Sequence, residues 1–206
     1  SEEIRPVPDQ MAQSLSANLY FARLTDHGRS GAAMAEATVA AWMRDTAEAL
    51  AIAGRIGARV IVLSTSTGGT LSGAVACDPS LSQNVAGMVF VSPNFGINNA
   101  AARLLTWPFA RIWIPLLVGR ERHVETLNSE QGKYWTNVYP IAATLPMPAL
   151  VRKVIGKNFG DVSVPALFIM SEKDQVVRPD MIEKIAQRWG GQKQVLKVVP
   201  GPNDDP

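Results

Sequence analysis

The sequence VIVLSTSTGGTLSGAVA, residues 60–76, contains the pattern that decides the fold. An apolar run at 60–63 leads into STSTGG, and residues compatible with a helix follow. A short buried strand that turns sharply into a helix gives this pattern. Ser66 falls on the turn, just beyond the carboxyl end of the strand, where open parallel sheets bind their ligands. We therefore examine Ser66 as a nucleophile whose side chain the turn projects outward.

Two other interpretations of this turn involve no chemistry at Ser66. A glycine-rich loop can pack a helix against a sheet, or it can bind phosphate at the helix N-terminus. Neither G-x-G-x-x-G nor G-x-x-x-x-G-K-[ST] occurs here, which disfavours dinucleotide and nucleoside triphosphate sites. If Ser66 is a nucleophile, the amide of Thr67 lies at the helix N-terminus, where partial positive charge stabilises an oxyanion.

The flanking sequence predicts an α/β fold in which a mainly parallel sheet carries helices on both faces. The predicted strands are residues 17–24, 60–63, 88–92, 164–170 and 194–199. One helix is predicted from Met34 to about Gly54, and another at 180–189. Residues 101–157 interrupt this alternation with a segment rich in Trp, Pro and Leu, which we predict to be a helical insertion.

Two motifs resemble those of the α/β-hydrolase family. STSTGG resembles its nucleophile elbow, G-x-S-x-G, with Ser64 in place of the first glycine. SEKDQVVRPD, directly after the strand at 164–170, resembles the loop that carries the acid of the catalytic triad. The resemblance implies that Ser66 is the nucleophile, Asp174 the acid, and the Thr67 amide part of the oxyanion hole.

The histidine of such a triad follows the acid in the chain. The loop in which the resemblance expects it, after QVLKVVP, reads GPNDDP and contains no histidine. The resemblance therefore implies that the histidine and the second oxyanion amide lie beyond the two ends of this sequence, and that the 206 residues alone turn over little substrate. His27, in TDHGRSG, resembles the GHG-type loop that shapes the site in bacterial esterases and monoacylglycerol lipases. His123, among the charges of GRERHVETL, is expected at the surface.

The predicted domain organisation is a hydrolase core at 1–100 and 158–206, incomplete at both ends, with a helical cap at 101–157. Most apolar side chains of the cap should pack inward, while others line an acyl pocket or contact a lipid surface. We take Trp107, Trp113 and His27 as candidates for the substrate pocket. The large apolar residues of the predicted cap are Leu104, Leu105, Trp107, Phe109, Ile112, Trp113 and Leu116.

Composition excludes several classes of function. A net charge of +2, with both signs interspersed, gives no basis for nucleic-acid binding. The sole cysteine, Cys77, excludes an intramolecular disulfide, and one cysteine with two histidines disfavours a dedicated zinc site. The predicted chemistry requires no metal or organic cofactor. Proline and arginine interrupt the most apolar stretch, so no membrane span is predicted. The opening SEEIRPVPDQ is unlike a secretory signal, which makes the cytoplasm the default expectation.

These observations predict a serine hydrolase that cleaves small carboxylic esters through an acyl-enzyme intermediate. Two alternatives stay open at this point. One is an amidase or peptidase of the same fold, and the other is a binding scaffold in which Ser66 has no catalytic role. The oligomeric state, the acyl length and the natural substrate are not predicted.

Overall fold

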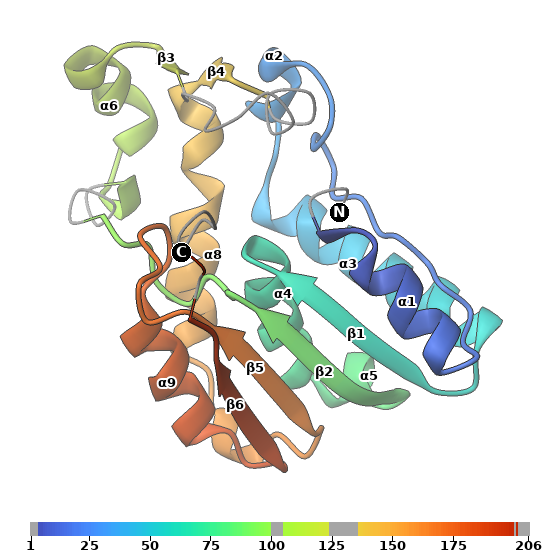
Figure 1. The fold of residues 1–206 in the computed structure, drawn as a ribbon. Helices are drawn as coiled ribbons and strands as arrows, with labels where there is room; N and C mark the ends of the chain where they lie inside the picture. The colour runs from blue at the N-terminus through green and yellow to red at the C-terminus, as the bar shows by residue number, and fades with distance from the viewer. Residues whose placement is uncertain (1–3, 100–104, 124–135, 200, 202–206) are drawn as a thin grey trace. The chain divides into compact units, whose positions relative to one another are not determined.

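The computed structural model describes residues 4–99, 105–123, 136–199 and 201 (Figure 1). The chain forms two compact units. The first unit contains Ser1–Ala49 and Arg103–Ala149, and the second contains Leu50–Ala102 and Leu150–Pro206.

The second unit is built on a parallel sheet of four strands in the order β1-β2-β5-β6 (Figure 1). Each strand pairs in parallel with the next, so their carboxyl ends lie along one edge of the sheet. The register pairs Thr65 with Val91, and Val91 with Ile169. The loops that follow β1, β2 and β5 are therefore neighbours. The strands are β1 (Val60–Thr65), β2 (Val85–Val91), β5 (Ala166–Met170) and β6 (Lys193–Lys197).

Helices connect these strands, as parallel pairing requires. Between β1 and β2 lie α4 (Thr67–Ala76) and the short α5 (Pro79–Ser82), and between β5 and β6 lies α9 (Pro179–Arg188). α8 (Pro146–Ile155) ends in this unit and is followed by the 3-10 turn η4 (Phe159–Asp161).

Aromatic side chains form the core beneath the sheet. Phe90 of β2 and Phe168 of β5 are paired in register and stack with their ring centroids 4.8 Å apart. Trp189, directly after α9, packs edge-on against both rings at 5.5 and 5.4 Å. Its indole N–H donates to Val164 O at 2.8 Å, which satisfies the one polar group of this buried side chain. Burial of each such side chain contributes about 2–3 kcal/mol, so this cluster fixes β2, β5 and α9 together.

The first unit contains helices and one exposed strand pair. β3 and β4 pair antiparallel, with Arg122 opposite Tyr139. Gly31 lies so close to β4 that a Cβ there would stand 2.0 Å from Val138 O, so only glycine fits. The elements of this unit are α1 (Val7–Ser14), α2 (Gly31–Met34), the first part of α3 (Val39–Ile56), α6 (Ala110–Val118), β3 (Glu121–His123), β4 (Val138–Pro140) and η3 (Ile141–Thr144).

Two sequence predictions about the first unit were wrong. Residues 17–24 form no strand: they are largely exposed and pair with no described strand, and an apolar-rich segment becomes a strand only where a partner strand receives its hydrogen bonds. The predicted helix does not begin at Met34, because α2 ends there and Thr38 starts α3. The Thr38 hydroxyl accepts a hydrogen bond from the Ala41 amide at 3.1 Å, as an N-cap residue does.

The described part of 101–157 is helical, as predicted, but it also contains the exposed pair of β3 and β4. Leu104, one of the apolar cap residues, lies outside the described residues. None of the described helices has the length and apolarity needed to span a membrane.

Candidate active site

Ser66 occupies the junction between β1 and α4 in a strained backbone conformation. Its φ and ψ are 50° and −118°, a positive φ that side-chain-bearing residues seldom adopt. Such strain costs about 1–3 kcal/mol and is found most often at functional sites. Among the residues that the structure describes, no group forms a hydrogen bond with Ser66 Oγ. The turn thus presents a hydroxyl at the carboxyl edge of the sheet.

The backbone around Ser66 is fixed by hydrogen bonds. Its amide donates to Val91 O at 3.2 Å, which continues the pairing of β1 with β2. Its carbonyl oxygen accepts from the amides of Gly69 at 2.9 Å, Asn94 at 3.0 Å and Thr70 at 3.3 Å. The amide of Thr67, the first residue of α4, donates to no group in the described part of the chain. It remains available at the helix N-terminus, where partial positive charge favours an anion.

The structure explains why Ser64 is tolerated where the family motif has glycine. The Ser64 side chain is buried, and its hydroxyl donates to Val89 O on β2 at 3.3 Å. A Cβ built on Gly68 would lie 3.8 Å from Ser64 Cβ, which is an ordinary contact. The crowded position is Gly69, where a Cβ would stand 2.5 Å from Pro93 Cβ and 2.9 Å from Pro93 Cα. The sequence alone does not distinguish these two glycines.

We expect Gly69→Ala to lower the free energy of unfolding by about 1–3 kcal/mol, because its methyl group forces Pro93 away from α4. Gly68→Ala is the matched control. It adds the same methyl group one residue earlier without a clash, so its effect should stay within about 0.5 kcal/mol or be stabilising. Urea unfolding of the two variants measures the difference. Equal destabilisation by both would contradict this packing.

Asp174 lies in the loop between β5 and α9 and is buried. Its Oδ1 accepts hydrogen bonds from the amides of Val176 at 2.8 Å and Val177 at 2.9 Å. The other carboxylate oxygen, Oδ2, accepts no hydrogen bond from any described residue. One oxygen therefore anchors the side chain to its own loop, and the second is left for another donor.

Surface ion pairs join the Asp174 loop, which contains Glu172, to β6 and α9. Lys197 of β6 contacts Glu172 Oε1 at 2.6 Å and Glu183 Oε1 of α9 at 2.7 Å. The hydrogen bond from Lys197 lowers the pKa of Glu172, and the two glutamates raise the pKa of Lys197. Next to the loop, the hydrogen bond from Arg178 lowers the pKa of Asp180. All of these charges are exposed, so each pair contributes little to stability by itself.

The sheet topology brings Ser66 and Asp174 to the same edge. Ser66 follows β1 and Asp174 follows β5, and β2 lies between these strands. Neighbouring strands are about 4.8 Å apart, which places β1 and β5 roughly 10 Å from one another. An imidazole with a hydrogen bond at each ring nitrogen bridges a gap of this order between two side chains. The second unit therefore brings together the predicted nucleophile, its neighbouring amide and the predicted acid.

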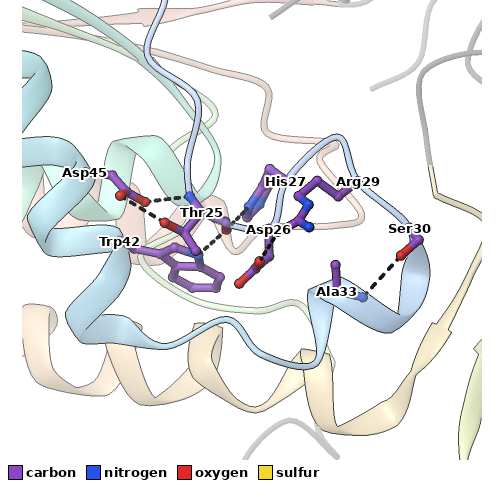
Figure 2. A network of polar contacts seen from close by, with 8 residues as sticks. All are labelled: Thr25, Asp26, His27, Arg29, Ser30, Ala33, Trp42 and Asp45. Carbon is purple, nitrogen blue, oxygen red and sulfur yellow. Dashed lines mark hydrogen bonds and ion pairs between the residues drawn. The ribbon is translucent and has the colours of Figure 1, made fainter.

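His27 belongs to the first unit and is anchored in a polar network with α3 (Figure 2). The network centres on Thr25, whose carbonyl oxygen accepts from Trp42 Nε1 at 3.2 Å and lies 3.4 Å from His27 Nδ1. The Thr25 amide and hydroxyl both donate to Asp45. The imidazole also packs edge-on against the Trp42 indole, with ring centroids 5.6 Å apart. These contacts give His27 a structural role within its own unit.

Asp26 explains the departure from a GHG-type loop just before His27. It has a φ of 68°, the left-handed conformation that favours glycine, and it stands where that loop has its first glycine. Its side chain is buried, with Oδ1 3.5 Å from Arg29 Nη1. Aspartate is among the few residues that tolerate this conformation.

The other predicted residues also lie in the first unit. His123 is on β3, where its side chain is exposed and Nε2 is 4.0 Å from Glu121 Oε2, as expected for a surface histidine. Trp107 and Trp113 pack edge-on with ring centroids 6.4 Å apart, and Trp113 Nε1 donates to Pro108 O at 3.0 Å. Among the described residues, no group of three or more His, Cys, Asp or Glu side chains is placed to hold a metal ion.

The contacts of the two histidines predict that neither is the base. We expect His27→Gln and His123→Gln to lower kcat for ester hydrolysis by less than about threefold, whereas loss of a general base costs roughly 10²- to 10⁴-fold. Steady-state kinetics of both variants checks this. A loss of three orders of magnitude in either variant would identify that histidine as the base.

Asn94 and Thr70, which bond to the turn at Ser66, were not predicted as site residues from the sequence. The sequence could have indicated Asn94, because Pro93 and Asn94 directly follow the predicted strand at 88–92 and therefore lie at the carboxyl edge of the sheet. The role of Thr70 could not be predicted from the sequence, because a threonine within a helix has no distinctive pattern and only the structure shows its tertiary partner.

Three solved structures of lipolytic and related proteins are similar in fold. One of two metagenome-derived lipolytic enzymes, LipS and LipT, is 20% identical in sequence to this chain, with a TM-score of 0.77. The match covers 96% of this chain and 78% of the other. DcsB in complex with its substrate analogue is 17% identical to this chain, with a TM-score of 0.60, and the match covers 95% of this chain and 77% of DcsB. A soluble variant of monoglyceride lipase from Saccharomyces cerevisiae, bound to a substrate analog, has 12% identity and a TM-score of 0.58, over 84% and 66%.

At these identities the similarity shows the fold, which confirms the predicted α/β-hydrolase architecture. No curated protein sequence matches the chain significantly. The family model described as serine aminopeptidase, S33, matches residues 9–202, nearly the whole sequence. The chain therefore belongs to the serine aminopeptidase, S33, family of α/β-hydrolase serine hydrolases.

Proposed function

We propose that this protein is a serine ester hydrolase that cleaves carboxylic acyl esters through an acyl-enzyme intermediate. The observation that carries the proposal is the strained Ser66 at the N-terminus of α4, whose hydroxyl forms no hydrogen bond with any described residue and which follows β1 at the same edge of the sheet as the Asp174 loop after β5. Family membership and the lipolytic enzymes among proteins of similar fold support the same chemistry. The strain is consistent with a catalytic serine, because backbone outliers concentrate at functional sites.

In the proposed mechanism, Ser66 Oγ attacks the acyl carbonyl carbon while a histidine takes the hydroxyl proton; the family resemblance expects this histidine after residue 199, and it is neither His27 nor His123. Asp174 accepts a hydrogen bond from that histidine through Oδ2 and stabilises its protonated form. The carbonyl oxygen becomes an oxyanion that the Thr67 amide stabilises. The C–O bond to the alcohol breaks, and the alcohol leaves with the proton from the histidine. Water then attacks the acyl-enzyme while the histidine takes a proton from it. The bond to Ser66 Oγ breaks, the histidine returns the proton to Oγ, and the carboxylic acid is released.

The substrate class in this proposal is an apolar acyl ester. α6 supports it, because the helix and its first flanking residue expose a row of large apolar side chains beside Arg111. We propose that this surface, in the predicted cap, contacts acyl chains or the lipid from which they come. Its exposed apolar residues are Phe109, Ile112, Leu116, Leu117 and Val118.

The family description favours a second candidate, a peptidase that releases amino-terminal residues. A matched panel, assayed with the natural full-length protein together with any residues beyond this sequence, separates the two: p-nitrophenyl esters of two to twelve carbons, the p-nitroanilide of the best acyl group, and aminoacyl p-nitroanilides. We expect kcat/KM for the best ester to exceed that for its anilide by at least about 100-fold. Preference for an aminoacyl anilide would establish the peptidase instead. Absence of turnover on every compound would favour a non-catalytic scaffold.

A further inference from the structure

The segment that follows β2, residues 92–98, connects the turn at Ser66 to the loop of Asp174. We call it the bridging segment. On the Ser66 side, the Asn94 amide donates to Ser66 O at 3.0 Å, and Pro93 fills the space beside Gly69. The start of the bridging segment therefore packs against the first turn of α4.

The other end of the bridging segment bonds to the acid loop. Asn98 Nδ2 donates to Asp174 O at 3.3 Å, and the Asn98 amide donates to Val176 O at 3.0 Å. The Arg178 amide donates to Gly96 O at 2.8 Å, and Ile97 forms a β-bridge with Val177. One short segment therefore contacts both the predicted nucleophile and the predicted acid.

Backbone strain shows that the bridging segment is held in place by its surroundings. Ser92 has a φ of 41° although a proline follows it, and residues before proline normally adopt extended conformations. Like Ser66, one strand away, it is a non-glycine residue in a sparsely populated region. Such conformations persist only where neighbouring contacts fix them.

Thr70 supplies one of these fixing contacts. It is fully buried in α4, and its Oγ1 donates to Asn94 O at 2.6 Å. A helical threonine commonly donates to the carbonyl four residues earlier, which here is Ser66 O. That oxygen already accepts three amides, and the Thr70 hydroxyl reaches the bridging segment instead. Asn94 is thus held on both sides, its amide by Ser66 and its carbonyl by Thr70.

We propose that Thr70 is a positioning residue for Ser66. Through Asn94 it holds the bridging segment that sets the separation between the turn at Ser66 and the Asp174 loop. The inference rests on the proposed function for its effect on catalysis, but the contact itself is independent of any reaction. Loss of the hydroxyl should loosen Asn94 and lower kcat without weakening the binding of substrate.

The test compares Thr70→Val, which keeps the shape and removes the donor, with Thr70→Ser, which keeps the donor. Hydrogen exchange resolved to single amides is measured for Asn94 and, as an internal reference for global stability, for Phe168 in the core. Thr70→Val should speed exchange at Asn94 by roughly tenfold or more while Phe168 is unchanged, and Thr70→Ser should restore protection. Equal protection of Asn94 in wild type and Thr70→Val would overturn the inference.

Kinetics on the best ester from the substrate panel give the second readout. Thr70→Val should lower kcat by about 10- to 100-fold with KM within about twofold, and Thr70→Ser should stay within about threefold of wild type. A wild-type kcat in Thr70→Val would overturn the positioning role. If wild type hydrolyses no ester, the proposed function fails, and the hydrogen-exchange measurement alone tests whether Thr70 holds Asn94 in place.

Asn98→Leu is a second variant at the opposite end of the bridging segment, used if Thr70→Val does not fold. It removes the donor to Asp174 O and should lower kcat by about 3- to 10-fold with KM unchanged. A kcat equal to wild type in Asn98→Leu would contradict a role for the bridging segment in positioning the acid.

Discussion

Ser66→Ala is expected to lower kcat/KM for ester hydrolysis by roughly 10⁴- to 10⁶-fold, because it removes the hydroxyl that forms the acyl-enzyme in the proposed mechanism. Alanine keeps the Cβ, and with it the strain at φ 50°, so the substitution removes only the hydroxyl. That hydroxyl forms no hydrogen bond with any described residue, so stability should change little. Steady-state kinetics and thermal unfolding of the variant measure the two effects separately.

Ser64→Ala is the matched control, since it removes a serine hydroxyl two residues earlier in the same turn. It loses the hydrogen bond to Val89 O, which contributes about 1 kcal/mol to stability, but it should keep kcat within a few-fold. If Ser66→Ala retains more than a tenth of wild-type activity, Ser66 is not the nucleophile.

Asp174→Asn should lower kcat by roughly 10³- to 10⁴-fold with little change in stability. The amide oxygen of asparagine can still accept from Val176 and Val177, so the loop keeps its anchor. The negative charge that stabilises a protonated histidine is lost, and the amide cannot hold the histidine in the required tautomer. Steady-state kinetics, with urea unfolding as the check on stability, measures the outcome.

Asp180→Asn provides the control for Asp174→Asn. Asp180 lies six residues further on, in α9, and pairs with Arg178 and Lys184 at the surface. Removing its charge weakens exposed ion pairs only, so activity should be unchanged. A similar loss of activity in both variants would show that general disturbance of this region, and not the acid, is responsible.

The sequence predicted the parts of the fold that depend on local pattern. Four strands were predicted in the right places, within a few residues, because buried apolar runs bounded by turn residues identify strands in a parallel sheet. The strand predicted at 17–24 was wrong because its apolar-rich residues pair with no described strand, and pairing is a tertiary property. The start of α3 was misplaced because several residues before Val39 are compatible with a helix, and only the hydrogen bond from Ala41 to Thr38 identifies the cap.

For the candidate site, local motif and chain order were enough to select Ser66 and Asp174. The sequence could not reveal how they are held. The bond from Thr70 to Asn94 joins residues 24 positions apart, and the contact of Gly69 with Pro93 depends on the register of β1 and β2. Such contacts come from packing, which no local pattern encodes.

The first measurement is labelling of the natural full-length protein, together with any residues beyond this sequence, by a fluorophosphonate probe, followed by mass spectrometry of the labelled peptide. Burial raises the pKa of Cys77, which keeps the only cysteine largely protonated and unreactive at neutral pH. We expect one probe per chain, attached to Ser66, and no labelling of Ser66→Ala. A folded protein that remains unlabelled, or one labelled at another residue while Ser66 is unmodified, would contradict the assignment of Ser66 as the nucleophile.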